Sequence, residues 1–112
     1  MTEAQSAFDF VIIGAGAAGE AAMELAREGG QSVAIVDRDL FGGSCAVWAC
    51  MPSKSLLHAA AVHQAGGDFP WEKASGFRDW MISREDVEYP SDANHASRYE
   101  AIGAEAIRGS AR

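Results

Sequence analysis

Hydrophobic and polar positions divide the first forty residues into a strand, a helix and a second strand. Residues 8–13 (FDFVII) form a short apolar run rich in aromatic and β-branched side chains, which is typical of a strand buried on both faces. Residues 20–28 (EAAMELARE) are almost all strong helix formers, and residues 32–36 (SVAIV) form a second buried strand. The buried face of the helix is expected to comprise Ala18, Ala22, Leu25 and Ala26. A helix of this length is the crossover that parallel strands need, so the pattern predicts a βαβ unit.

The rest of the chain is predicted from weaker patterns. The segment 44–65 is expected to be helical beyond Pro52, which is tolerated only near a helix start or at a kink. Residues 66–76 are expected to form a loop. The remaining expected elements are helices at 78–87 and 91–102 and a third strand at 104–107. No internal repeat is visible. We therefore expect one small α/β domain, with a Rossmann-like βαβ unit and a parallel sheet.

Composition and charge narrow the classes of function. Hydrophobic residues make up 48% of the 112 residues and charged residues 22%, which is an ordinary globular balance. The net charge is −7 and the basic residues are scattered, which argues against a nucleic-acid surface, because phosphate binding needs clustered Lys and Arg. The longest apolar stretch, residues 10–18, is too short to span a bilayer, and residues 1–8 lack a signal-peptide pattern. We expect a cytoplasmic protein with no membrane partner, where a cysteine pair indicates redox chemistry or metal binding.

A complete G-x-G-x-x-G motif joins the first predicted strand to the first predicted helix, which is the context that dinucleotide binding requires. Gly14 permits a tight turn, Gly16 lets the backbone approach a pyrophosphate, and Gly19 lets the helix pack closely on the strand. Ala17 and Ala18 lie at the helix N-terminus, whose free N–H groups and partial positive charge favour an anion. The alternative is a tight turn with no ligand, and the motif alone does not separate FAD from NAD.

An acidic residue at the end of the second predicted strand supports dinucleotide binding. Asp37 lies eighteen residues after Gly19, where a carboxylate can accept hydrogen bonds from an adenosine ribose. The same carboxylate would repel a 2′-phosphate, which disfavours NADP at this site. The neighbouring Arg38 could stack on the adenine or flank it.

The two cysteines of the chain lie five residues apart, after a pair of glycines. Cys45 and Cys50 can reach each other across a distorted helical turn, and a helix N-terminus together with the charge of Lys54 would stabilise a thiolate. A thiol pair of lowered pKa is what dithiol–disulfide exchange requires. Two alternatives stay open: inert buried thiols, or a zinc site in which His58 and His63 complete a C-x4-C-x7-H-x4-H pattern.

Together these segments resemble the N-terminus of the pyridine nucleotide–disulfide oxidoreductases, the family of dihydrolipoamide dehydrogenase, glutathione reductase and mercuric reductase. The resemblance is carried by FDFVIIGAGAAGEAAMELA, by VAIVDRDLFGGSCAVWACMPSK and, more loosely, by GAEAIRGSAR. Ala49 stands where many members have glycine, which is closer to the dihydrolipoamide dehydrogenase and mercuric reductase-like branches than to glutathione reductase.

The resemblance implies how FAD would bind. The glycine loop would hold the FAD pyrophosphate and Asp37 the adenosine ribose. Gly43 and Ser44 would contact the phosphate and ribityl region, while Ser110 and Ala111 would lie near the adenine. The implied cofactor-binding set is Gly14, Gly16, Ala17, Ala18, Gly19, Asp37, Arg38, Gly43, Ser44, Cys45, Lys54 and Ala111.

The resemblance also implies a catalytic role for the cysteines. Cys45 would be the interchange thiol, Cys50 would lie over the flavin as the charge-transfer thiolate, and Lys54 would lie near flavin N5. Electrons would run from NAD(P)H to FAD, then to the disulfide, and then to a small-molecule disulfide or another acceptor. Full-length members of the family are homodimers.

Residues 1–112 would be only part of an FAD-binding domain. The NAD(P)-binding domain and the C-terminal interface domain, which donates a His–Glu pair from the partner subunit, would be absent, so the chain alone is expected to be inactive. A strand that flanks the first one would also be absent, leaving an apolar sheet edge open. Two rival functions remain: an FAD monooxygenase or oxidase with incidental cysteines, and a non-enzymatic nucleotide- or zinc-binding module.

Overall fold

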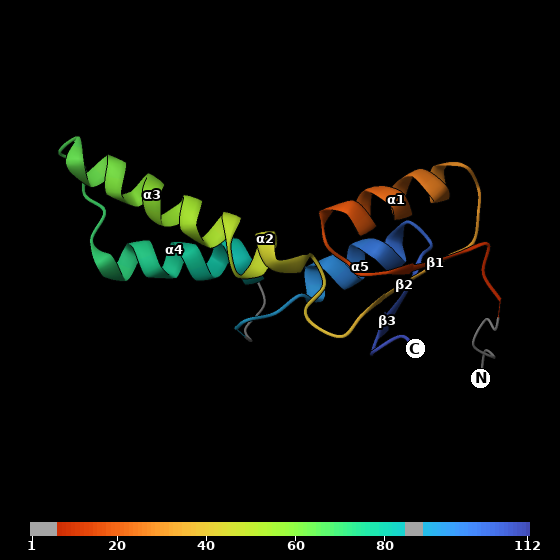
Figure 1. The fold of residues 1–112 in the computed structure, drawn as a ribbon. Coiled ribbons are helices and arrows are strands. Elements are labelled where there is room, and N and C mark those ends of the chain that lie inside the picture. The colour runs from red at the N-terminus through yellow and green to blue at the C-terminus, as the bar shows by residue number, and fades with distance from the viewer. Residues whose placement is uncertain (1–6, 85–88) are drawn as a thin grey trace.

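The structure is a computed structural model that describes residues 7–84 and 89–112. An α/β body, in which α1 and α5 lie beside the sheet, continues into a hairpin of two helices, α3 and α4, so the molecule measures 56 × 27 × 25 Å (Figure 1). In chain order the described elements are β1 (Phe10–Ile13), α1 (Ala17–Glu28), β2 (Val33–Asp37), α2 (Gly43–Val47), α3 (Cys50–Gln64), α4 (Trp71–Ser83), α5 (Ala93–Ala101) and β3 (Glu105–Arg108).

The sheet is parallel and has the order β1-β2-β3 in the part of the chain that is described. Ile12 pairs with Ile35, and Ile35 pairs with Ala106 on the other side, so β2 is the central strand. Helix α1 connects β1 to β2, and the long segment from α2 to α5 returns the chain to β3. The predicted α/β class, the βαβ unit and the third strand are confirmed.

The two faces of the sheet differ in burial. Val33 and Ile35 of β2 pack against Met23 of α1 and Tyr99 of α5, so both helices cover the same face. Side chains alternate along a strand, so neighbours of these residues point to the opposite face. There Val11 and Ile13 are 59% and 73% exposed.

The prediction that the first strand is buried on both faces is therefore wrong. Among the described residues, no strand pairs with the outer edge of β1 and no helix packs on the face opposite α1 and α5. By contrast, β2 is buried along Val33–Val36, because it has a neighbour on each side.

The buried face of α1 also differs from the predicted one. Met23 is fully buried and Ala26 packs partly on the core, whereas Leu25 is 71% exposed. Ala18 and Ala22 are exposed as well. The helix carries apolar residues on nearly every side, so periodicity alone did not fix which side meets the sheet, and the long Met23 side chain fills the space between the sheet and α5.

Within 44–65 the predicted helix beyond Pro52 is present as α3, and a second, shorter helix, α2, precedes it. Trp48 and Ala49 separate the two helices, so Pro52 lies in the first turn of α3. A residue in the first turn of a helix has no partner for its N–H within the helix, so proline loses no hydrogen bond there.

The predicted loop at 66–76 is too long. Helix α4 begins at Trp71, because Pro70 (φ −65°) precedes a run of helix-forming residues, and Gly76 is accommodated within the helix.

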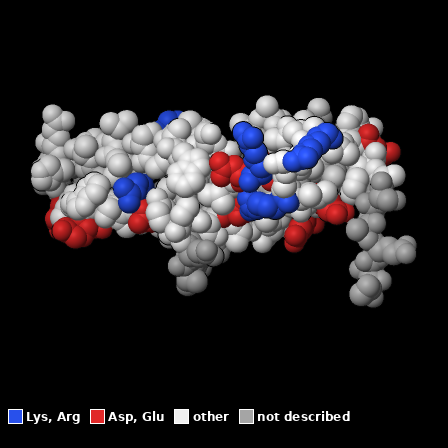
Figure 2. Space-filling view, turned by 60° about the horizontal axis from the view of Figure 1, so that its bottom comes forward, with Lys and Arg blue, Asp and Glu red and all other residues white. Residues whose placement is uncertain are grey.

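Helices α3 and α4 pack antiparallel and are joined by aromatic contacts. The ring of Phe77 lies 6.2 Å from Phe69, 6.5 Å from His58 and 6.1 Å from Trp80. Figure 2 shows that most of the hairpin surface on this face is uncharged, while basic and acidic side chains gather over the α/β body.

The helix expected at 78–87 ends at Ser83 in the structure, and residues 85–88 lie outside the described part. None of the described helices has the length and apolar character of a membrane span.

Candidate active site

The glycine loop forms a tight turn between β1 and α1. Gly14 has φ +107°, a conformation that favours glycine, and its N–H donates to the carbonyl of Val36 (2.7 Å). A Cβ at Gly19 would overlap the carbonyl oxygen of Gly14, so only glycine allows α1 to begin so close to the strand. A Cβ at Gly16 would meet no protein atom within 4 Å, and α1 begins there without a side-chain cap. The N-terminus of α1 is thus open to an anion.

Asp37 stabilises the glycine loop from the end of β2. Its carboxylate accepts hydrogen bonds from the N–H groups of Ala15 (2.8 Å) and Asp39 (2.9 Å). Burial by itself raises the pKa of Asp37, but the backbone N–H groups of Ala15, Asp39 and Arg38 and the charge of Arg108 hold that pKa below its ordinary value. The group is therefore ionised at neutral pH. Sequence reasoning gave Asp37 only a ligand-binding role and missed this contact with the loop.

A cleft of about 270 Å³ lies at the carboxyl ends of the three strands. The carboxyl edge is where open parallel sheets bind ligands. The third strand is tied to this edge, since the N–H of Gly109 donates to the carbonyl of Asp37 (2.9 Å). The cleft is lined by Ile13, Gly14, Val36, Asp37, Arg38, Gly109, Ser110 and Ala111, so it gathers the residues predicted for the adenosine end of a dinucleotide.

The paired glycines join the cysteine segment directly to the glycine loop. The N–H of Gly42 donates to the carbonyl of Ala15 (2.9 Å). Gly43 has φ +75°, and a Cβ at this position would lie 2.7 Å from the Cα of Gly16. Backbone therefore packs on backbone at this point, and α2 begins against the loop that opens α1.

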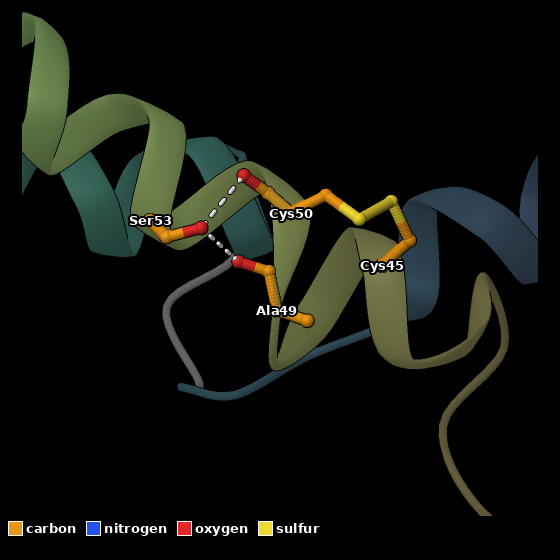
Figure 3. The surroundings of a disulfide bond; sticks show 4 residues. All are labelled: Cys45, Ala49, Cys50 and Ser53. Atoms are coloured by element: carbon orange, nitrogen blue, oxygen red, sulfur yellow. Dashed lines mark hydrogen bonds between the residues drawn. A yellow bond between two sulfur atoms is a disulfide. The ribbon is translucent and has the colours of Figure 1, made fainter.

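Cys45 and Cys50 form a disulfide that links α2 to α3 (Figure 3). The sulfurs are 2.11 Å apart and the Cα atoms 4.5 Å apart. The break at Ala49 brings the two cysteines together, and the Ser53 hydroxyl donates to the carbonyl of Ala49 (2.6 Å) in the same turn (Figure 3). Cys45 is exposed and Cys50 is half-buried. This arrangement argues against inert buried thiols, because the pair is bonded and accessible from outside.

Comparison with known proteins identifies the family. The sequence profile described as "Pyridine nucleotide-disulphide oxidoreductase" matches residues 8–104. The chain belongs to this family. The predicted resemblance is thus confirmed, and with it the class of flavoprotein disulfide oxidoreductases.

Characterised relatives carry several names within this family. The chain is 36% identical over 86 residues to a glutathione reductase of Burkholderia cepacia, covering 72% of this chain and 19% of the relative. It is 42% identical over 78 residues to a mercuric reductase of Streptomyces lividans (67% and 16%). It is 33% identical over 97 residues to a dihydrolipoyl dehydrogenase of Rhizobium etli (87% and 18%). The chain therefore spans about a fifth or less of the length of these relatives.

A solved structure has the same fold. The HOCl-induced flavoprotein disulfide reductase RclA from Escherichia coli, determined as a Cu(II) complex, superimposes with a TM-score of 0.74 at 24% sequence identity. The match covers 96% of this chain and 23% of that one. The body and the hairpin thus share the fold of the corresponding part of that structure.

Other predicted site residues lie at the exposed rim of these elements. Ala17 and Ala18 are exposed in the first turn of α1, Ser44 is exposed in the first turn of α2, and Lys54 is exposed one turn after Cys50. His58 and His63 are exposed on α3. In residues 7–84 and 89–112, no three His, Cys, Asp or Glu side chains gather as a metal site.

Sequence reasoning missed the side chains that hold the loop between Asp37 and Gly43. The carboxylate of Asp92 accepts from the N–H of Phe41 (2.6 Å) and pairs with Arg108, whose guanidinium lies 4.3 Å from the centre of the Phe41 ring. Asp92 lies 51 residues from Phe41 and 16 residues from Arg108 in sequence, so no local pattern indicated these contacts.

Proposed function

We propose that this chain is the FAD-binding part of a flavoprotein disulfide oxidoreductase, with residues 1–112 forming part of that domain. The observation that carries the proposal is the contact between Gly43 and Gly16, which joins the start of the disulfide segment to the N-terminus of α1. A dinucleotide whose pyrophosphate lies at that N-terminus can extend its adenosine into the strand-end cleft. Its other end can extend along the cysteine segment.

The residues present fit FAD. The N-terminus of α1 is open at Gly16, and the ionised Asp37 lies in the cleft with lone pairs that can accept ribose hydroxyls. Ser110, Ala111 and Arg38 would flank the adenine. Bound FAD supplies a two-electron carrier that links a nicotinamide to a disulfide.

We propose that the cysteines perform the exchange. Two electrons and two protons convert the Cys45–Cys50 disulfide into two thiols. The thiolate of Cys45, the more exposed sulfur, then attacks a substrate disulfide and expels one substrate thiol, and Cys50 attacks the mixed disulfide and expels the second. The Cys45–Cys50 bond re-forms, so one substrate disulfide is reduced for each electron pair. The electrons would come from NAD(P)H by way of FAD, with a small-molecule disulfide or another acceptor as the substrate.

The whole enzyme needs more than this segment in our proposal. The chain spans about a fifth or less of the relatives named above, so the nicotinamide site and the partner acid–base pair would lie in other domains of a homodimer. The bonded cysteines favour this function over a monooxygenase or oxidase with incidental cysteines, because a disulfide beside the cofactor loop has a direct role in dithiol–disulfide exchange.

A pair of glycine variants tests the proposal. Gly43 and Gly30 have nearly the same φ, +75° and +79°, but only at Gly43 would a Cβ meet the glycine loop. We expect Gly43→Ala to weaken FAD binding at least tenfold in a fluorescence titration, and Gly30→Ala to leave it within about twofold, since backbone strain is matched. Saturable FAD binding that both variants retain equally, or no FAD binding by the wild-type chain, would contradict the proposal.

A further inference from the structure

The double-glycine turn has a second neighbour, the imidazole of His95 on α5. Gly42 has φ +101°, and a Cβ at this position would lie 2.7 Å from both Cε1 and Nε2 of His95. The ring edge thus packs on the backbone of Gly42, whose N–H donates to the carbonyl of Ala15 in the glycine loop. A side chain on α5 therefore supports the junction between the anion site and the disulfide segment.

The other edge of the same ring is fixed by Glu20. Nδ1 of His95 lies 2.9 Å from Oε1 of Glu20, and the hydroxyl of Tyr99 donates to the same oxygen. A carboxylate only accepts hydrogen bonds, so Nδ1 carries a proton and Nε2 faces Gly42. Burial, followed by the hydrogen bond to Glu20, raises the pKa of Tyr99 far above its ordinary value, so the Tyr99 hydroxyl remains a donor. The orientation of the imidazole is thus determined at both edges.

Glu20 has an unfavourable position for an anion site. It lies in the first turn of α1, directly after Gly19, so its negative charge is close to where a pyrophosphate would bind. His95, Tyr99 and Arg98 all engage this carboxylate from α5; Nη2 of Arg98 lies 3.8 Å from Oε2. The hydrogen bonds from His95 and Tyr99 and the positive charge of Arg98 offset the charge of Glu20 and reduce its repulsion of a bound phosphate.

We propose that His95 is a positioning residue for the cofactor loop: it holds Gly42 against the glycine loop and, by donating to Glu20, offsets a negative charge beside the anion site. The second half of this proposal, the donation to Glu20 beside the anion site, rests on the proposed FAD function. The first half concerns the loop itself and is measurable without any ligand.

Amide hydrogen exchange of the uniformly labelled chain tests the first half. His95→Ala should accelerate exchange of the Gly42 N–H about tenfold, because the ring no longer packs on the Gly42 backbone and holds it against Ala15. The N–H of Gly14, bonded to Val36 within the sheet, should keep its protection and so report that the body is folded. His63→Ala, on the distant hairpin, is the matched control and should change neither amide. His95→Asn retains the Nδ1-like donor but lacks the ring edge, so it should accelerate Gly42 exchange as well.

FAD affinity tests the second half. His95→Ala should weaken FAD binding about tenfold in the wild-type background and only about threefold in a Glu20→Gln background, where the charge is already gone. Unchanged Gly42 exchange in both His95 variants would overturn the proposal whatever happens to FAD. An equal loss of affinity in the two backgrounds would overturn the electrostatic half. A wild-type chain that binds no FAD would count against the proposed function, while the exchange experiment would still decide the role of His95 at Gly42.

Discussion

The α/β body and the α3–α4 hairpin are held together in different ways. In the body, backbone atoms at glycines contact one another directly: Gly19 packs against Gly14, and Gly43 packs against Gly16. The N–H of Gly42 also donates a hydrogen bond to the carbonyl of Ala15. In the hairpin, ring packing around Phe77 joins two regular helices. A methyl group added at Gly19 or Gly43 should therefore damage the body, whereas the hairpin should tolerate side-chain changes in the ring cluster around Phe77. The disulfide lies at the junction of the two regions.

The largest effect is expected at Gly19. A Cβ at this position would overlap the backbone carbonyl of Gly14, so the main chain would have to shift, and Gly19→Ala should reduce the free energy of unfolding by about 3 kcal/mol. It should also abolish FAD binding. Urea unfolding followed by circular dichroism measures the first effect.

The matched control for Gly19→Ala is Gly76→Ala within α4. Both glycines are helical, but a Cβ at Gly76 would meet no atom within 4 Å. Alanine there should stabilise the chain by about 0.5–1 kcal/mol, because it lowers the conformational entropy of the unfolded state. Equal destabilisation by the two variants would contradict the difference between body and hairpin.

A smaller loss is expected for Asp37→Asn. The amide can accept from only one of the two N–H groups that the carboxylate binds, so the variant should unfold about 2 kcal/mol more readily at pH 7. The folded pKa of Asp37 is lowered, so the contribution of its charge is complete above the unfolded pKa of about 3.9 and disappears as the pH falls through the folded value.

The pH dependence of unfolding checks the sign of this effect. The difference in free energy of unfolding between wild type and Asp37→Asn should be constant from pH 7 to about pH 5 and should shrink below about pH 4. A difference that is as large at pH 3 as at pH 7 would show that the carboxylate charge does not stabilise the glycine loop.

The smallest effect is expected in the hairpin. Phe77→Leu keeps an apolar side chain but removes ring contacts with Phe69, His58 and Trp80, so it should cost about 1 kcal/mol of stability. FAD affinity should stay within about twofold of wild type. If the free energy of FAD binding fell by more than the free energy of unfolding, the hairpin would take part in the cofactor site.

Sequence patterns predicted the body better than the hairpin for a physical reason. Glycine motifs and β-branched runs specify backbone geometry within a few residues, so β1, α1, β2 and the redox pair could be located along the chain. The start of α4 at Trp71 was missed because Pro70 and Gly76 weaken the helical pattern of the local sequence. Packing against α3 stabilises the helix in spite of them. The exposed face of β1 was missed because burial depends on what covers the sheet.

The same distinction applies to the candidate site. Residues predicted from local motifs, such as Gly14 and Asp37, do line one cleft. Asp92 and His95 were missed because each contacts a loop about fifty residues earlier in the chain. Neither an Asp before a helix nor a His within one has a local pattern that indicates such a distant contact. Long-range support of a loop is visible only once the fold is known.

Anaerobic reduction of the FAD complex by dithionite, followed by absorbance, tests most directly whether the glycine loop and the disulfide form one site. The account predicts uptake of about four electrons per FAD, two for the flavin and two for Cys45–Cys50, falling to about two in Cys50→Ser. Uptake of two electrons by the wild-type complex, with the disulfide still intact, would contradict it.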